Sequence, residues 1–552
     1  MPITPTYPGV YIEELPSFSH SVTAAPTSVT VFVGYTHPFK TVTFGTAIEI
    51  FSFADYQANF GGFFSFTPWL PDYVGHAVFQ FFQNGGSTAW VIGLKPTAYL
   101  DAAGQPVAGN ITLIPLTVNI DVAPATVTLT ALEPGGLDPA VTPPSNNNIA
   151  TPTVVQLANV HPGQDSQGNT ISLADIIITY GTQVETYRAV PAADIATQLG
   201  QSALVGVTVA NGTPATFPAA AVFNFDYATL PPANATLINT RDYGPVFQTG
   251  ASLDVDVPIF NLMVLPGISP VNIEQSAVVS DALTFCEQKR AFFIMDAPPN
   301  ATTSRVSPPP EQTPPGTPAQ IAMDTFWRTD TPPVSANGAI YFPYLNTIDP
   351  LTQLPSVSPP SGFVAGIFAR EDVSYSVGKA PAGLETTING ASGVVAWGRM
   401  TDMQQGVLNG DGVDCLRDFP GIGTVVFGAR TLVSENPAFE QWKYVPVRRT
   451  ALFIEQSLYG SLGWAVFQPN DTPLWNALTQ EVNAFMLTLF RQGNYFQGTT
   501  PSEAFLVQCD STTTTPADIN AGRVNILVGF APLKPAEFVV VQITQLAGQT
   551  QT

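Results

Sequence analysis

Uninterrupted apolar runs mark the most strongly predicted strands of this chain. Residues 27–34 form a run rich in β-branched residues, and residues 259–267 are mostly apolar, which is typical of strands buried on both faces of a sheet. A third apolar run follows at 291–298, and the spacing over 275–289 predicts a helix between the last two runs. The order strand, helix, strand predicts a parallel pair with the helix on one face.

The pattern changes to alternation between residues 101 and 243. Apolar and polar residues alternate over 110–122 and 126–131, and Pro, Gly and Asn interrupt the segment often. Alternation predicts strands with one face in a core and the other in solvent. We interpret residues 101–243 as a β-rich, solvent-facing insertion in a discontinuous α/β domain formed by residues 25–100 and 244–361.

The last third of the chain, residues 362–530, reads as a compact α/β core. Thr472 is a good helix N-cap with Pro473 at the first helical position. Apolar residues then recur at helical spacing to Gly493, which predicts a long helix that buries one face. Because a regular apolar stripe is most simply a packing surface, we assign no cofactor to this helix.

Arg448 and Arg449 begin another helix of this core. In an acidic protein, adjacent arginines most often mark a solvated or ion-paired helix start. They could instead meet an acidic partner surface. Both alternatives stay open from the sequence.

Two short apolar segments lie at the chain ends, each bounded by Pro or Gly. Residues 1–24 and 531–552 are too short to hold a core, so we read them as arms. A short strand can add to the edge of a sheet in a neighbouring molecule. The residues expected to exchange between subunits are Val10, Tyr11, Ile12, Glu13, Glu14, Phe538, Val539, Val540, Val541 and Ile543.

Composition excludes several classes of protein. The chain has 552 residues, 45% hydrophobic and only 11% charged, with a net charge of −22. This acidity argues against binding nucleic acid, whose phosphates require clustered Lys and Arg. The first residues lack the pattern of a secretory signal, and no apolar run is long enough to span a membrane. We therefore expect synthesis in the cytoplasm and no direct membrane insertion.

Motifs for catalysis or cofactor binding are not found. The sequence has no G-x-S-x-G, and Gly378-Lys379 lacks the rest of a phosphate-binding loop. The three cysteines and four histidines are scattered without metal-ligand spacing, so we predict no metal, no cofactor and no enzyme activity. A glycosidase using two separated carboxylates stays open as a minor alternative.

Segments distributed over both ends and most of the last third resemble the contractile tail sheath proteins of phage tails, tailocins and phage-tail-like injection systems. The resemblance is carried, in the order found in that family, by residues 7–14 (YPGVYIEE), 27–34 (TSVTVFVG), 292–296 (FFIMD), 360–372 (PSGFVAGIFARED), 378–382 (GKAPA), 428–432 (GARTL), 490–493 (FRQG) and 534–538 (KPAEF). The insertion matches only loosely.

The resemblance implies a structural role. Sheath subunits of that family stack as hexameric rings around an inner tube, with the C-terminal core facing the tube and the terminal strands joining neighbouring sheets. The partners implied are other copies of the chain, an inner tube protein, and baseplate and terminator or cap proteins. Arg448 and Arg449 become candidates for contact with the inner tube. Contraction would be a rigid-body rearrangement that drives the tube through a target envelope, without nucleotide hydrolysis.

A different class of function is also consistent with part of the sequence. The Thr- and Asn-rich insertion and the high proline content would suit a β-rich protein that binds a receptor or a glycan, such as a fibre or a capsid decoration. The strand–helix–strand segment and the helical core are not needed by a fibre, so we prefer the sheath interpretation.

Overall fold

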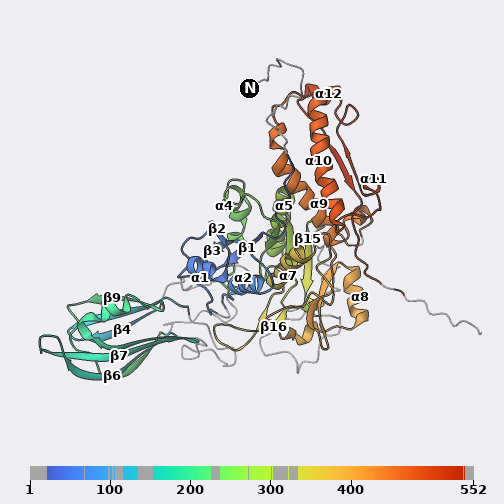
Figure 1. Cartoon of the computed structure of the whole chain (residues 1–552). Coiled ribbons are helices and arrows are strands. Elements are labelled where there is room, and N and C mark those ends of the chain that lie inside the picture. The colour runs from blue at the N-terminus through green and yellow to red at the C-terminus, as the bar shows by residue number, and fades with distance from the viewer. Residues whose placement is uncertain are drawn as a thin grey trace, which may run out of the picture. The chain divides into compact units, whose positions relative to one another are not determined.

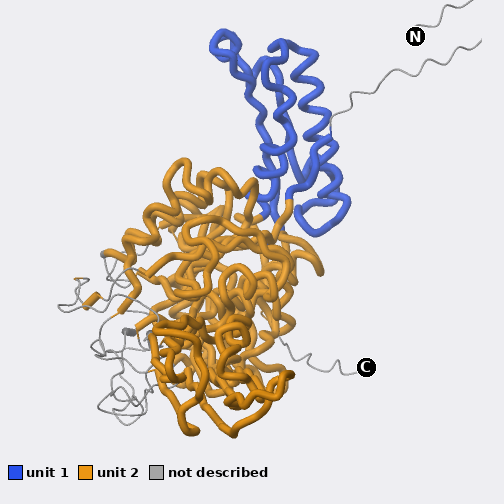
Figure 2. Tube along the Cα trace, turned by 90° about the vertical axis from the view of Figure 1, so that its left-hand side faces the viewer, with its two compact units in different colours: residues 1–25, 450–534 blue, residues 26–449, 535–552 orange. Residues whose placement is uncertain are grey.

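A computed structural model of the chain (Figure 1) describes residues 21–66, 69–96, 100–101, 105, 116–134, 153–225, 236–270, 273–299, 301–302, 321–322, 334–434, 436–538 and 540. The chain divides into two compact units (Figure 2). Unit 1 comprises residues 1–25 and 450–534, and unit 2 comprises residues 26–449 and 535–552.

An eight-stranded sheet forms the centre of unit 2. Its strand order is β2-β3-β1-β11-β12-β15-β19-β20, in which the inner pairs are all parallel and the two edge strands are antiparallel to their neighbours. The strands are β1 (Thr30–Tyr35), β2 (Ala47–Ile50), β3 (Ala89–Leu94), β11 (Leu262–Val264), β12 (Phe292–Asp296), β15 (Gly338–Phe342), β19 (Val413–Phe419) and β20 (Gly423–Val426).

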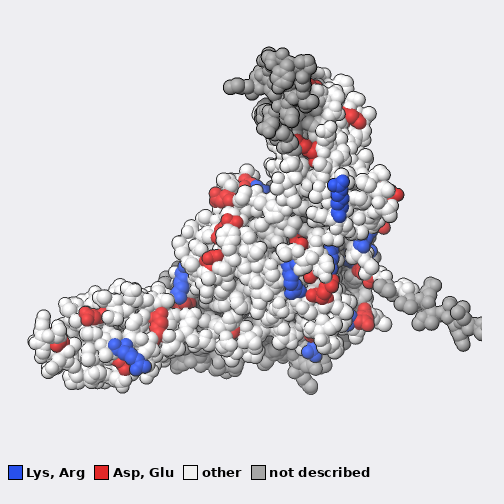
Figure 3. Space-filling model, in the orientation of Figure 1, with Lys and Arg blue, Asp and Glu red and all other residues white. Residues whose placement is uncertain are grey.

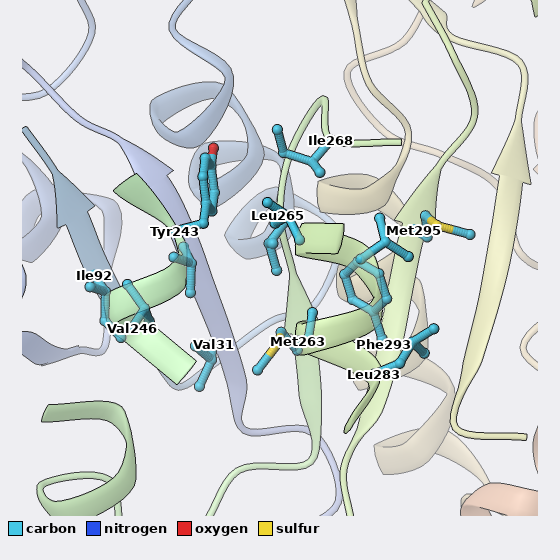
Figure 4. Packing of buried hydrophobic residues seen from close by; sticks show 14 of the residues in the cluster. Val31, Ile92, Tyr243, Val246, Met263, Leu265, Ile268, Leu283, Phe293 and Met295 are labelled. Carbon is cyan, nitrogen blue, oxygen red and sulfur yellow. The ribbon is translucent and has the colours of Figure 1, made fainter. Parts of the chain in front are cut away.

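The apolar runs account for the central strands. Every residue of β1, β11, β12 and β15 is buried, as expected for parallel strands covered on both faces. The predicted strand, helix and parallel strand are β11, α5 (Ile273–Lys289) and β12. Figure 4 shows side chains of neighbouring strands, such as Val31, Met263 and Phe293, in one packed cluster with Leu283 of α5.

Helix α7 (Ser361–Ser374) is buried over nearly its whole length and packs against α2 (Tyr73–Gln83) and the sheet. Two glycines permit this close approach. A Cβ at Gly362 would lie 2.5 Å from the Cα atom of Ala77, and one at Gly366 would lie 2.7 Å from the Cβ atom of Asn84. Any side chain at these positions would push the two helices apart.

The remaining elements of unit 2 are short and flank the sheet. The helices are α1 (Phe53–Phe60), α4 (Ser252–Val255) and α8 (Asp402–Gly410). A small sheet has the order β17-β16-β18, with β16 (Leu345–Ile348), β17 (Pro355–Ser358) and β18 (Gly393–Val394), and β13 (Ala301–Thr302) pairs with β14 (Ile321–Ala322).

The segment predicted as a β-rich insertion contains two antiparallel sheets (Figure 1). Their inner faces share a core that is separate from the core of the large sheet. The first has the order β4-β5-β9 and the second β10-β6-β7-β8. Their bounds are β4 (Thr117–Val122), β5 (Ala125–Ala131), β6 (Val154–Gln164), β7 (Thr170–Tyr180), β8 (Gln183–Pro191), β9 (Val205–Ala210) and β10 (Ala221–Asn224), with α3 (Ile195–Leu199) between β8 and β9.

Unit 1 is mainly helical and holds one small sheet. Helix α10 (Thr472–Gln492) buries the predicted stripe and ends at Gly493, whose φ of 76° is left-handed. Its N-cap is Asp471, not Thr472 as predicted, because the Asp471 carboxylate accepts the backbone N–H of Leu474. The other elements are the end of α9 (Val445–Ser461), α11 (Pro501–Ala504), β21 (Phe505–Gln508), α12 (Pro516–Asn520) and β22 (Leu527–Phe530).

The structure divides the last third differently from the predicted core at 362–530. Strand β19 pairs with β15, so residues up to 426 complete the same sheet that begins at residue 30. The separate unit begins only at Thr450. Local apolar patterns predicted the central strands near residues 30, 262 and 292 but carried no information on which strands pair across the chain. This is why the predicted boundary at residue 362 falls inside the large sheet.

Candidate functional site

The predicted C-terminal arm leaves unit 2 beside a buried arginine. One edge of the Arg430 guanidinium donates two hydrogen bonds to the carboxylate of Glu537, with Nε–Oε1 at 2.9 Å and Nη2–Oε2 at 2.8 Å. The same carboxylate accepts hydrogen bonds from Asn409 Nδ2 at 2.5 Å and from the Tyr444 hydroxyl at 3.2 Å. Bidentate arginine–carboxylate pairs are among the strongest hydrogen-bonded contacts in proteins. Three side chains in all donate hydrogen bonds to the Glu537 carboxylate.

The backbone around Arg430 fixes the direction of its side chain. Arg430 is 3% exposed, and its N–H donates to Asp414 Oδ1 at 2.8 Å. Burial raises the pKa of Asp414 well above its usual range. A Cβ at Gly428 would lie 2.8 Å from the Asp414 Cα atom, so only glycine allows the 428–430 segment to pass so close. The GARTL and KPAEF segments quoted above therefore meet in space.

A cavity of about 400 Å³ lies at this arm root, within unit 2. Its apolar lining includes Ala380, Ala382, Phe427, Pro535 and Phe538, and Glu537 adds a polar edge. The GKAPA segment thus joins the two segments already described.

The predicted N-terminal arm enters unit 2 beside a second buried arginine. Arg449 pairs with Asp372 through Nη1–Oδ1 at 2.8 Å and Nη2–Oδ2 at 2.6 Å, with both side chains nearly inaccessible. Arg449 Nη2 also donates to the backbone carbonyl of Thr27 at 2.9 Å. Asn261 holds the same stretch, since its Nδ2 donates to the Pro26 carbonyl at 2.7 Å and its Oδ1 accepts Val29 N–H at 2.9 Å.

The two predicted tube-contact residues differ in this structure. Arg449 is 4% exposed and forms an intramolecular ion pair, which is the ion-paired alternative for a helix start. Arg448 is half-buried, donates to Asn337 Oδ1 at 3.1 Å, and lies over the Trp442 ring. A tube contact by Arg448 and Arg449 stays a prediction, and the burial of Arg449 weighs against its share of that contact.

Most of the residues predicted to exchange between subunits lie outside the described part of the chain. These are Val10, Tyr11, Ile12, Glu13, Glu14, Val539, Val541 and Ile543. Phe538 and Val540 are described, belong to no strand of this single chain, and are 75% and 81% exposed. Their pairing with a neighbour stays a prediction.

The small sheet of unit 1 has exposed edges. β21 and β22 pair only with each other among the strands that the structure describes. Leu506 and Leu527 on these strands are 53% and 51% exposed. A two-stranded sheet with exposed apolar residues can accept additional strands.

Sites for metals or membranes are not found in the described ranges. No three His, Cys, Asp or Glu side chains come together there as metal ligands. No helix among those residues is long and apolar enough to cross a bilayer. Figure 3 shows that charged residues are sparse on the face it presents, so most of that surface is uncharged.

Comparison with known proteins identifies the C-terminal part of the chain. Residues 438–545 match the family model of the phage tail sheath C-terminal domain. None of the curated proteins searched matches the chain.

Solved structures match over nearly the whole length. A chain from the anti-feeding prophage (AFP) helical sheath in the contracted state is 22% identical, with 98% of this chain and 100% of that chain covered and a TM-score of 0.54. A chain from the PVC sheath complex of an extracellular contractile injection system, in the contracted state, is 20% identical, with 98% of each covered and a TM-score of 0.54. A chain from the AFP baseplate is 21% identical, with 98% and 99% covered and the same TM-score. These likenesses establish that the chain has the fold of those proteins.

Sequence reasoning missed the side chains that hold the arm roots. Arg430 and Glu537 stand in segments already noted for their resemblance, but their separation of 107 residues gave no reason to pair them. Asp372 ends another such segment and pairs with Arg449, 77 residues away. The available signal was that each of these segments places at least one charged residue beside small or apolar residues.

Proposed function

We propose that this chain, which belongs to the phage tail sheath family through residues 438–545, is the structural subunit of a contractile sheath. It polymerises helically around an inner tube and contracts to drive that tube through a target envelope. Its partners are other copies of itself in stacked hexameric rings, the tube protein, and baseplate and terminator or cap proteins. The particle is a phage tail or a phage-tail-like device.

The observation that carries the proposal is the family match, joined to a fold likeness that covers 98% of the chain. That likeness covers nearly the whole chain, so it supports a sheath subunit over the receptor- or glycan-binding alternative. A sheath role also explains the sparse surface charge, because large subunit interfaces are depleted of charged residues at their centres.

Strand exchange joins the subunits in this proposal. The arm strands at 10–14 and 538–543 add to the exposed edges of the β21–β22 sheet in neighbouring copies. Each backbone hydrogen bond so formed contributes about 1 kcal/mol net. When one surface of a subunit binds a different surface of the next, and each step adds a rotation and a rise, the result is a helical polymer. The energy of contraction comes from new interfaces between rigid bodies, so the role requires no active site.

Electron microscopy tests the proposal. The purified chain is stained alone and after co-expression with its tube protein. Hollow striated cylinders are expected in the co-expressed sample. Dispersed monomers or trimers in both samples would contradict the proposal and favour the receptor-binding alternative.

Truncation tests the exchange of strands separately. Deleting residues 1–15 should abolish tube-like assemblies and leave a monomer with unchanged circular dichroism. Intact polymers from that truncated chain would show that the N-terminal strand is not required.

A further inference from the structure

We infer that Arg449 and Arg430 are positioning residues that fix the chain to unit 2 at the roots of the two terminal arms. At the N-terminal root this attachment follows two contacts within unit 1, where the N–H groups of Thr23 and Ala25 donate to the hydroxyls of Ser461 and Ser457. The inference deepens the proposed sheath function and rests on it for the role of the arms in assembly. The anchoring itself is a property of the isolated chain and can be measured without assembly.

The N-terminal root is held by its backbone. Arg449 donates to the Thr27 carbonyl, and Asn261 binds both Pro26 and Val29. Strand β1 begins at Thr30, so these contacts occupy the few residues between the arm and the central sheet. Because the Arg449 guanidinium is oriented by Asp372 and stacked over the Phe368 ring at 4.8 Å, it cannot swing away with the arm.

The C-terminal root is held by its side chain. Glu537 is the first acidic residue after unit 2 resumes at Pro535, and its carboxylate is bound by Arg430, Asn409 and Tyr444. The next residue, Phe538, is 75% exposed. The chain therefore passes from a fixed residue to a solvent-exposed one within a single peptide unit.

The charges around each arginine support anchoring rather than a general surface role. The Arg430 guanidinium is paired with the Glu537 carboxylate, and the Arg430 backbone N–H donates to Asp414 Oδ1. Other arginine pairs are more exposed and do not lie at an arm root. In Arg417–Asp402 the Asp402 side chain is 92% exposed, and in Arg523–Asp518 the Arg523 side chain is 65% exposed. By contrast, the arginine of each pair at an arm root is only 4% exposed.

Proteolysis of the full-length monomer tests the C-terminal anchor. Chymotrypsin can cleave after Phe538 only when the residues before it leave the clamp. We expect Glu537→Gln to raise the rate of this cleavage about tenfold, measured by mass spectrometry at a temperature at which circular dichroism shows the variant to be folded. The matched control is Asp402→Asn, which removes an exposed arginine partner at the rim of the same cavity and should leave the rate unchanged. An equal cleavage rate in Glu537→Gln and the unaltered chain would overturn the anchor.

Assembly tests whether the anchors contribute to polymer formation. The Glu537→Gln chain and the double variant Arg449→Met/Asp372→Leu, which leaves no unpaired buried charge, are pelleted over a range of concentrations. We expect each to need about tenfold more protein to polymerise. Unchanged assembly by variants whose arm roots are released would overturn the inference. If the unaltered chain forms no polymer, the proposed function fails, while the cleavage rate still decides the anchor.

Discussion

The roots of the two arms use the same chemistry at different depths. At the N-terminal root both members of the Arg449–Asp372 pair are inaccessible, with side chains 4% and 1% exposed. At the C-terminal root Arg430 is equally buried but the side chain of Glu537 is 21% exposed. A fully buried pair is costly to break because the remaining charge has no access to water. The partly exposed carboxylate of Glu537 can instead be hydrated. The first root is therefore part of the stability of unit 2, and the second is a releasable attachment.

The largest effect is expected from breaking the fully buried pair. Arg449→Met leaves Asp372 buried without its cation and should lower the free energy of unfolding by about 3–5 kcal/mol. Urea unfolding followed by circular dichroism measures this loss. The double variant Arg449→Met/Asp372→Leu should recover most of it, because neither charge is then buried alone. A loss below about 1 kcal/mol in the single variant would remove the distinction between the two roots, since an exposed pair gives no more than that.

A smaller loss is expected at the C-terminal root. Arg430→Met removes hydrogen bonds between charged groups, and one such bond contributes about 1.5–3 kcal/mol. The loss is limited because the Glu537 carboxylate can turn to solvent. We expect the loss of stability to lie near the lower end of that range and below the loss in Arg449→Met, by the same urea measurement. If Arg430→Met were the more destabilising variant, depth of burial would not be what separates the roots.

The pH dependence of the two roots should have opposite signs. Burial acts to raise the pKa of Glu537, but the Arg430 pair and the hydrogen bonds from Asn409 and Tyr444 outweigh it, so the pKa is lowered in the folded chain. Its contribution is thus present above the unfolded pKa and is lost as pH falls through the lower folded value.

For Asp372 burial is the larger effect and raises the folded pKa, although Arg449 opposes it. A raised carboxyl pKa favours the folded chain on the acidic side, and that contribution declines as pH rises through the folded value. Acidification through the lowered folded pKa of Glu537 should protonate its carboxylate and speed cleavage after Phe538, measured with an acid-active protease of similar specificity. Glu537→Gln should abolish this pH dependence, and an unchanged dependence in that variant would assign it to another group.

The smallest effect is expected from an exposed pair. Arg523 is 65% exposed and contacts Asp518 at 2.9 Å. Arg523→Met should change the free energy of unfolding by less than about 1 kcal/mol and leave cleavage after Phe538 unaltered. A larger loss would mean that solvent exposure does not reduce the contribution of an ion pair to the stability of this protein.

Local patterns sufficed for elements whose burial is uniform or periodic. The apolar run at 291–298 and the helix before it became β12 and α5 because parallel strands buried on both faces leave a continuous signal. The stripe of α10 was equally plain, and the N-cap was missed by one residue because Asp471 and Thr472 are both good caps.

Pairings over long separations could not be read in this way. Strand β19 joins β15 about 70 residues after it, and nothing in the local sequence of Val413–Phe419 specifies that neighbour. The arm roots have the same character, because a lone Glu537 after Pro535-Ala536 looks like any exposed acid until Arg430 is found beside it. The resemblance drew attention to both segments, 428–432 and 534–538, but only the structure shows that they are in contact.

Cryo-electron microscopy of the assembled full-length chain would test the central claim most directly, because it resolves the strands that neighbours contribute. The account predicts that residues 10–14 and 538–543 of neighbouring copies extend the β21–β22 sheet, while Thr27 and Glu537 stay bound to Arg449 and Arg430 of their own chain. A polymer in which both edges of β21–β22 are bare, with each arm folded onto its own chain, would contradict it.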